Sequence, residues 1–365
     1  MWNPKDSNVY RKIHHIRIRP RRGRTGCHFF YKHLTTSWSL PETLKYMQTE
    51  IGTDIFKAKM ILERGGLVAI PTETVYGLAA NALDPLAVAR IFEAKNRPAF
   101  DPLIVHISKF KELYKYTSHS IPELSDIANR FWPGPLTVLL PKNELIPDMV
   151  TSGSDKVAIR VPGHPLTLEL LSTLDFPVAA PSANPFGYVS PTTAGHVYDQ
   201  LNGKVDYILD GGPSRVGGES TIIGFDRGEM VVYRKGGLEI EELQAVFPGN
   251  IRINDFSDSN PAAPGMLKKH YSPGKKVLLL EDTSDLEGYD KDKTGLLRYS
   301  SPVSGFSCQF ILSEKEDLKE AAARLFEGLR YLDKQPVDTI FIEFVPERGL
   351  GRAINDRLRR TLAEE

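Results

Sequence analysis

The sequence predicts an α/β protein built from two domains of unequal size. Short apolar runs alternate with segments of helical periodicity from about residue 54 to residue 247, which favours a mixed, twisted sheet with helices packed on it. The stretch 250–276 is polar, contains three prolines and two glycines, and has no periodicity. A second, smaller α/β unit follows it. With 365 residues the chain is long enough for both domains.

The first domain opens with a helix that Asp54 can cap. Residues 67–70 form an apolar run that predicts a buried strand. Residues 85–95 have helical spacing, so Lys95 and Arg97 lie where a helix ends and the chain turns. Cations at the end of a helix complement its dipole, and this is the purely structural interpretation of the pair.

The same alternation continues through the rest of the chain. Apolar runs predict strands at 103–107, 136–140, 157–162, 178–180, 207–209, 222–225 and 230–234, and then at 277–280 and 339–344. Helical spacing predicts helices at 121–131 and 165–174, a helix opened by residues 190–192, an amphipathic helix at about 318–332 and a last helix from about residue 353. A glycine-rich loop at 211–218 leads to Ser220.

Composition excludes several classes of protein. Lys plus Arg equals Asp plus Glu at 46 each, so any basic site must be local. No run approaches the roughly 20 apolar residues of a membrane-spanning helix, and we expect no membrane partner. The two cysteines, Cys27 and Cys308, lie far apart in dissimilar contexts. That pattern indicates a reducing, cytoplasmic compartment, and we expect no structural metal.

Residues 1–46 are a basic extension, with seven Lys or Arg between positions 11 and 24 and only two acids, Asp6 and Glu42. An organelle presequence and an RNA-binding arm are two interpretations of such a segment. We favour a third, in which the extension is disordered and outside the working fold, because Met47 would make a natural start before the first helix.

Five motifs then follow one another along the chain: Pro-Thr-Glu-Thr-Val-Tyr-Gly-Leu at 71–78, Lys-Asn-Arg at 95–97 with Asp-Pro-Leu at 101–103, Ala-Ile-Arg-Val-Pro at 158–162, Pro-Ser-Ala-Asn at 181–184, and the loop before Ser220. In this combination the chain resembles the YrdC-type threonylcarbamoyl-AMP synthases. His-Tyr-Ser-Pro at 270–273 and the second α/β unit resemble the long, two-domain form of that family. The resemblance implies a YrdC-like catalytic domain at 47–249, an ordered linker at 250–276 and a smaller Rossmann-like domain at 277–365.

The resemblance also implies a reaction. L-threonine, bicarbonate and ATP give threonylcarbamoyl-AMP and pyrophosphate, which is the first step of the threonylcarbamoyladenosine modification of tRNA. Other proteins then transfer the threonylcarbamoyl group to tRNA. The chain has no Gly-x-x-x-x-Gly-Lys-Ser/Thr loop, so ATP is not held in the P-loop manner, and Mg²⁺ is expected to arrive with ATP.

Residue chemistry agrees with such a reaction. A carbamate oxygen attacks the α-phosphorus while pyrophosphate leaves, and this concentrates negative charge. The site therefore needs fixed cations and hydrogen-bond donors more than a nucleophilic side chain. The chain offers four cations and three hydroxyls for this: Lys95, Arg97, Arg160 and Arg234, with Ser182, Ser190 and Ser220.

The resemblance assigns roles residue by residue. The characteristic catalytic set is Lys95, Arg97, Ser182 and Asn184. The ATP contacts are Arg97, Asp101, Lys156, Ser182, Ser190, Arg234 and Tyr271, where Tyr271 belongs to a linker that covers the nucleotide. The threonine contacts are Thr74, His106, Arg160, Ala180 and Ser220, with Arg160 pairing the substrate carboxylate.

Some assignments keep an alternative. Asn184 is equally well explained as the residue that fixes the turn after Ser182. Asp101 better suits a turn cap before Pro102 than a Mg²⁺ or ribose ligand, because an acid repels phosphate. Arg234 is equally a solvated cation at a strand end. The rival function for the first domain is an RNA-binding module without catalysis.

Overall fold

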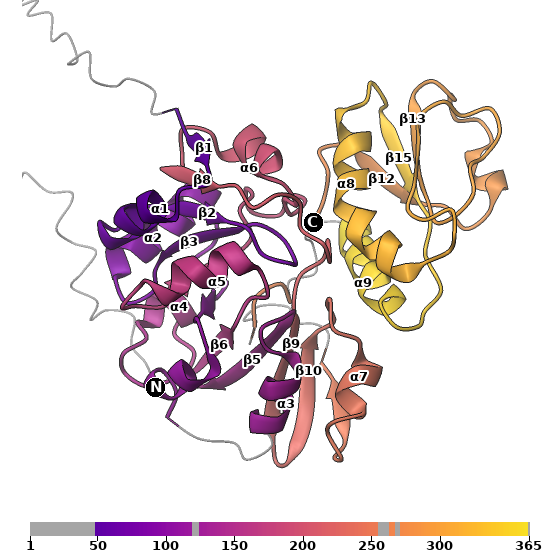
Figure 1. The fold of residues 1–365 in the computed structure, drawn as a ribbon. Helices are drawn as coiled ribbons and strands as arrows, with labels where there is room; N and C mark the ends of the chain where they lie inside the picture. Colours follow the sequence, from indigo (N-terminus) through magenta and orange to yellow (C-terminus); the bar gives the residue numbers. More distant parts are fainter. Residues whose placement is uncertain (1–47, 119–123, 255–262, 267–270, 364–365) are drawn as a thin grey trace, which may run out of the picture. The chain divides into compact units, whose positions relative to one another are not determined.

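The computed structural model describes residues 48–118, 124–254, 263–266 and 271–363 (Figure 1). The basic extension predicted at 1–46 lies outside the described residues, and so does His270 of the linker. Among the described residues, no helix combines the length and the apolar character that crossing a bilayer requires.

The first domain contains a large mixed sheet, as predicted. In the described residues it has eleven strands in the order β1, β8, β2, β3, β7, β4, β6, β5, β9, β10, β11. Their bounds are β1 (Glu50–Gly52), β2 (Val68–Ile70), β3 (Gly77–Asn81), β4 (Ile104–His106), β5 (Leu136–Pro141), β6 (Lys156–Arg160), β7 (Val178–Ala179), β8 (Tyr207–Leu209), β9 (Thr221–Asp226), β10 (Glu229–Arg234) and β11 (Ile251–Ile253). The sheet contains both parallel pairs, such as β4 with β6, and antiparallel pairs, such as β5 with β6.

Three of these strands were not predicted. β1 has only three residues, and β3 reads Gly-Leu-Ala-Ala-Asn, which lacks the β-branched and aromatic residues that mark strands. β11 lies inside the stretch expected to be a linker without periodicity. It pairs in parallel with β10, so the start of that stretch extends the sheet.

The helices of the first domain are α1 (Ile55–Glu63), α2 (Pro85–Lys95), α3 (Leu124–Phe131), α4 (Asp148–Thr151), α5 (Pro165–Ser172), α6 (Ala194–Leu201) and α7 (Ile240–Gln244). Asp54 caps α1 as predicted, and its side chain accepts from the backbone N–H of Lys57 at 3.0 Å. Asn96 ends α2 in the left-handed region with φ 51°. The helix predicted to open at 190–192 begins instead at Ala194, because Thr193 is its N-cap.

The C-terminal domain has a small parallel sheet in the order β12, β15, β13, β14. These strands are β12 (Lys276–Leu279), β13 (Thr294–Arg298), β14 (Gln309–Ile311) and β15 (Thr339–Ile342). Helices α8 (Leu318–Lys334) and α9 (Gly351–Leu362) pack on this sheet (Figure 1). The sequence predicted β12, β15 and both helices. It did not predict β13 and β14.

A buried apolar cluster joins helices α8 and α9 to the first domain. It contains Phe326 and Leu329 of α8, Val189 of the first domain and Tyr271 of the linker. The ring of Tyr271 stacks on that of Phe326 with 5.4 Å between their centroids. The linker therefore contributes to the apolar core of the C-terminal domain.

Candidate active site

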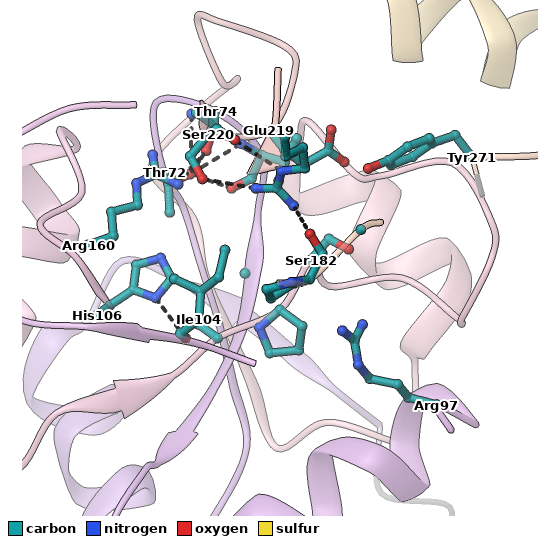
Figure 2. A pocket seen from close by; sticks show the side chains of 17 residues that line it. Thr72, Thr74, Arg97, Ile104, His106, Arg160, Ser182, Glu219, Ser220 and Tyr271 are labelled. Carbon is teal, nitrogen blue, oxygen red and sulfur yellow. Dashed lines mark hydrogen bonds between the residues drawn. The ribbon is translucent and has the colours of Figure 1, made fainter. Parts of the chain in front are cut away.

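A cavity lies where strands of the large sheet end (Figure 2). β4 and β6 are parallel and in register, so His106 and Arg160 lie side by side at the ends of the two strands. Ala180 follows β7, and Ser220 directly precedes β9. Nine residues predicted to bind substrates line the cavity: Thr74, Arg97, His106, Arg160, Ala180, Ser182, Ser220, Arg234 and Tyr271. The topology of the sheet thus brings together residues spread over almost 200 positions.

Arg160 is buried and is held on every nitrogen. Its Nε donates to the carbonyl of Gly134 at 3.2 Å, and its Nη1 donates to the Thr74 hydroxyl at 3.0 Å. Its Nη2 forms an ion pair with Glu73, whose other carboxylate oxygen accepts from the backbone N–H of Gly163 at 2.7 Å. A positively charged group with a fixed orientation therefore faces the cavity.

His106 is a neutral ring at this end of the cavity. Burial, with the charge of Arg160 adding to it, lowers the pKa of His106 to about 3. Nδ1 lies 3.3 Å from the carbonyl oxygen of Ile104. An uncharged imidazole can hydrogen-bond a ligand without adding a second positive charge beside Arg160.

Arg97 lies on the other side of the view in Figure 2, with Tyr271. Its Nη2 donates to the carbonyl of Pro102 at 2.8 Å and lies 2.8 Å from Oδ2 of Asp101. Burial raises the pKa of Asp101, and the Arg97 charge opposes that rise. Asp101 itself does not line the cavity, and its backbone N–H closes a turn on the carbonyl of Pro98 at 3.2 Å.

Arg234 is buried, so its alternative interpretation as a solvated cation at a strand end is wrong. Its Nη2 donates to the Ser220 hydroxyl at 3.0 Å and its Nε to the Ser220 carbonyl at 3.0 Å. Its Nη1 donates to the carbonyl of Pro264 at 3.2 Å, so the linker touches the cation directly. Gly265 follows with φ 77°, and a Cβ there would lie 3.0 Å from Nη1 of Arg234. A side chain there would strain the left-handed backbone and would require Arg234 to shift by a few tenths of an ångström.

Two family models match the chain. One, described as "Telomere recombination", matches residues 60–236, and the other, "Threonylcarbamoyl-AMP synthase, C-terminal domain", matches residues 238–363. The threonylcarbamoyl-AMP synthase of Pyrococcus abyssi is 42% identical over 315 residues, which are 82% of this chain and 91% of the relative. That of Bacillus subtilis is 39% identical over 319 residues, which are 84% of this chain and 92% of the relative. The chain belongs to the two-domain threonylcarbamoyl-AMP synthases.

A solved structure supports the same assignment. The crystal structure of P. abyssi Sua5 complexed with L-threonine has a TM-score of 0.80 and 40% identity, and the match covers 86% of this chain and 97% of that one. The synthase is therefore an ATP-using nucleotidyltransferase that makes threonylcarbamoyl-AMP, the first step of tRNA threonylcarbamoyladenosine modification.

Lys95 of the synthase does not line the cavity. Its ammonium group is buried and donates to the carbonyl oxygens of Ser182 and Asn184, so it clamps the turn that carries Ser182. Burial lowers the pKa of Lys95 well below its usual value, and the nearby Arg97 adds to this. The side-chain amide of Asn184 donates to the carbonyl of Tyr188 at 2.7 Å and to that of Pro185 at 2.9 Å. Both residues hold the turn in place.

Two further predicted contacts lie away from the cavity wall. The Ser190 hydroxyl donates to Oε1 of Glu219 at 2.7 Å, and only Glu219 of this pair lines the cavity. Lys156 begins β6 and is half-buried, whereas Arg160, which lines the cavity, ends that strand. A separation of four strand residues corresponds to about 13 Å.

Sequence reasoning missed two acids of the synthase. Glu219 lines the cavity, and Glu73 pairs with the buried Arg160. Both belong to quoted motif regions, since Glu73 lies in the first motif and Glu219 directly precedes Ser220. Their partners, however, lie 87 and 138 positions away, at Arg160 and Arg357. No local pattern in the sequence connects such residues.

Proposed function

We propose that one cavity holds both substrates, with L-threonine at the strand-end side and ATP at the side that faces the linker. The main observation behind this proposal is that all five predicted threonine contacts and four of the predicted ATP contacts line the same cavity. The crystal structure of the similar Sua5 contains L-threonine, which supports a threonine site in this fold.

On the threonine side, we assign the substrate carboxylate to Arg160. Three of the five N–H groups of this guanidinium are used by Gly134, Thr74 and Glu73, so two remain for a ligand. The neutral ring of His106 and the Ser220 hydroxyl hydrogen-bond the polar groups of threonine. With a pKa of about 3, His106 is too weak a base to take the proton of the threonine amine and acts as a hydrogen-bonding partner.

On the ATP side, Arg97, Arg234 and the Ser182 hydroxyl stabilise the negative charge of the phosphates. The threonine nitrogen forms a bond to the carbon of bicarbonate, and the carbamate forms as the elements of water leave. A carbamate oxygen then bonds to the α-phosphorus while the bond from that phosphorus to pyrophosphate breaks. Tyr271, from the linker, covers the nucleotide and excludes water from a hydrolysable product.

Mg²⁺ enters as part of the substrate Mg-ATP. Among the described residues, no group of three or more His, Cys, Asp or Glu side chains comes together as a metal site. Two acids that could bind a metal ion are already paired with arginines, Glu219 with Arg357 and Asp101 with Arg97. These residues do not suit a resident ion, and the phosphate oxygens of ATP with bound water supply its ligands.

The product then passes to tRNA-modifying proteins, and we place the reaction in the cytoplasm. An RNA-binding module without catalysis is the weaker candidate. The arginines that line the cavity are at most 8% exposed. Side chains buried to that degree reach a small ligand inside the cavity and not the phosphates of an RNA groove.

Pyrophosphate release from ATP in the presence of bicarbonate tests the proposal. We expect release with threonine, much slower release with serine, and background release without an amino acid. An enzyme that consumes ATP equally in all three reactions contradicts a threonine site. RNA affinity measured between 50 and 200 mM salt serves as the second arm: a steep loss of affinity together with threonine-independent ATP use would favour the RNA module.

A further inference from the structure

Helix α9 of the C-terminal domain carries a buried arginine that contacts Glu219, a residue of the cavity wall. We propose that Arg357 is a positioning residue of the synthase: it holds Glu219, and through Glu219 it fixes the Ser190 hydroxyl beside the bound ATP. The inference rests on the proposed placement of ATP. It gives the C-terminal domain a part in the geometry of the active site.

Glu219 connects Arg357 to the cavity. It is the one acid among the described residues that line the cavity, and it is 7% exposed. Its Oε1 accepts from the Ser190 hydroxyl at 2.7 Å, and its Oε2 accepts from Nε of Arg357 at 3.1 Å. An unpaired carboxylate at this place would repel the phosphates of ATP. The charge of Arg357 cancels it.

Arg357 is itself fixed by several contacts. Its Nη1 donates to Oδ2 of Asp356 at 3.0 Å and to the carbonyl of Lys235, which directly follows β10. Its guanidinium carbon lies 5.6 Å from the centre of the Tyr271 ring. One side chain thus touches the residue after Arg234, the acid before Ser220 and the tyrosine that covers the nucleotide. Lys235 and Tyr271 belong to the ATP side, and Glu219 is bonded to Ser190 on that side.

Two neighbouring arginines keep the Glu219 carboxylate ionised. Burial by itself would raise the pKa of Glu219, but Arg357 first and Arg234 second lower it below its ordinary value. Two nitrogens of Arg234 already donate hydrogen bonds to Ser220. Arg357 is therefore the larger of the two charges that keep Glu219 ionised, and together with the Ser190 hydroxyl it fixes the carboxylate.

Helix α8 provides an independent observation. Arg330 donates from Nε to the carbonyl of Ser190 at 3.3 Å and from Nη2 to the carbonyl of Val189 and to Oε1 of Gln200, the latter at 3.0 Å. The backbone of Ser190 is thus held by α8, while its hydroxyl is held by α9 through Glu219. Both helices of the C-terminal domain converge on one residue beside the ATP side of the cavity.

Arg352 offers a matched control on the same helix. It also forms an ion pair with the first domain, through Glu241, but the two side chains are 31% and 46% exposed and neither lines the cavity. An exposed pair of this kind adds little to stability. Arg352→Met therefore shows what the loss of an ion pair to the first domain does when the cavity wall is left intact.

The experiment measures pyrophosphate release by the full chain, with ATP varied at saturating threonine and threonine varied at saturating ATP. For Arg357→Met we expect kcat to fall tenfold to a hundredfold and the KM for ATP to rise at least fivefold, with the KM for threonine within twofold of wild type. Arg357→Lys, which keeps the charge, should restore part of the ATP affinity. Arg352→Met should stay within twofold of wild type in all constants.

A structural role alone predicts a different result. Loss of folded enzyme lowers the apparent kcat and leaves both KM values unchanged, and that outcome overturns the proposal. So does an Arg352→Met variant that is as defective as Arg357→Met. If Arg357→Met does not fold, the double variant Glu219→Gln with Arg357→Met removes the unpaired charge. We expect it to fold and still to have a raised KM for ATP, and a wild-type KM there also overturns the proposal.

Failure of the proposed substrate placement is distinguishable from failure of this inference. An inactive wild type, or one whose pyrophosphate release ignores threonine, contradicts the placement. An active wild type whose kinetics are matched by Arg357→Met contradicts only the role of Arg357.

Discussion

The two sides of the cavity are built in different ways. On the threonine side, Arg160 and His106 end two hydrogen-bonded strands of the large sheet, and the cation is paired with Glu73 from the loop after β2. On the ATP side, Arg97 follows a helix, and Arg234 ends a strand but donates to Pro264 of the linker. The first side belongs to one domain, whereas the second also depends on the linker and the C-terminal domain.

This difference assigns different tasks to the two sides. A site on sheet ends keeps its geometry whether or not the other substrate is bound, which suits recognition of a small amino acid. A site that is completed by a linker can be closed over a reactive intermediate. The two sides should therefore respond differently to substitution.

The largest effect is expected for Arg160→Met on the threonine side. The change leaves Glu73 buried without its cation, so the free energy of unfolding should fall by about 3–5 kcal/mol. The kcat/KM for threonine should fall by a factor on the order of 100 or more. Urea unfolding and pyrophosphate release measure the two effects, with Arg352→Met as the control. A variant with normal stability would show that the pair with Glu73 is not formed.

Next in size is a contrast between two neighbouring cations on the ATP side. Arg97→Met removes a cation that lines the cavity, so kcat should fall on the order of a hundredfold. It also leaves the buried Asp101 without its cation, so the free energy of unfolding should fall by about 3–5 kcal/mol. Lys95→Met removes the donor that serves the carbonyls of Ser182 and Asn184, so it should lower the free energy of unfolding by about 1–3 kcal/mol. Unchanged stability of Lys95→Met would contradict the clamp assigned to Lys95.

A smaller effect appears as a dependence of stability on pH. The pKa of His106 is about 3 in the folded protein, against about 6.5 when unfolded, so between these values the unfolded chain binds the extra proton. Stability contributed by the neutral ring is present above pH 6.5 and is lost as the pH falls. From pH 6.5 to pH 4.5 the loss is about 2–3 kcal/mol. His106→Asn should remove this part of the slope in urea unfolding, and an unchanged slope contradicts a buried, neutral His106.

The smallest effect is expected for Lys156→Ala. Lys156 and Arg160 lie at opposite ends of β6, and only Arg160 lines the cavity, so the KM for ATP should stay within twofold of wild type. Its role in ATP binding remains a prediction from the sequence, and ATP-dependent kinetics decide it. A rise of fivefold or more would bring Lys156 into the ATP site.

The sequence predicted the fold and most of the cavity wall, and the exceptions have physical reasons. Apolar runs located strands such as β4 and β6, and the order of motifs brought Thr74, Arg160 and Ser220 into one site. β3 was missed because Gly-Leu-Ala-Ala-Asn carries no strand propensity and is buried by its neighbours.

The sequence also did not predict the direction in which some side chains point. Lys95 was correctly placed at the end of a helix, but its sequence neighbours do not show that its ammonium group turns inward to two carbonyls. Arg357 was missed because its partners, Glu219 and Lys235, lie more than 120 positions earlier in the chain. Such contacts follow from the packing of the two domains and not from any local period.

In our proposal threonine and ATP occupy separate sides of one cavity, and two variants test this division most directly. Thr74→Val keeps the shape of the side chain but removes the hydroxyl bonded to Arg160. Arg97→Lys keeps the charge but removes the planar guanidinium with its several N–H donors. In steady-state pyrophosphate release, Thr74→Val should raise only the KM for threonine and Arg97→Lys only the KM for ATP, each about tenfold. If both variants raise the same constant, the division of the cavity is wrong.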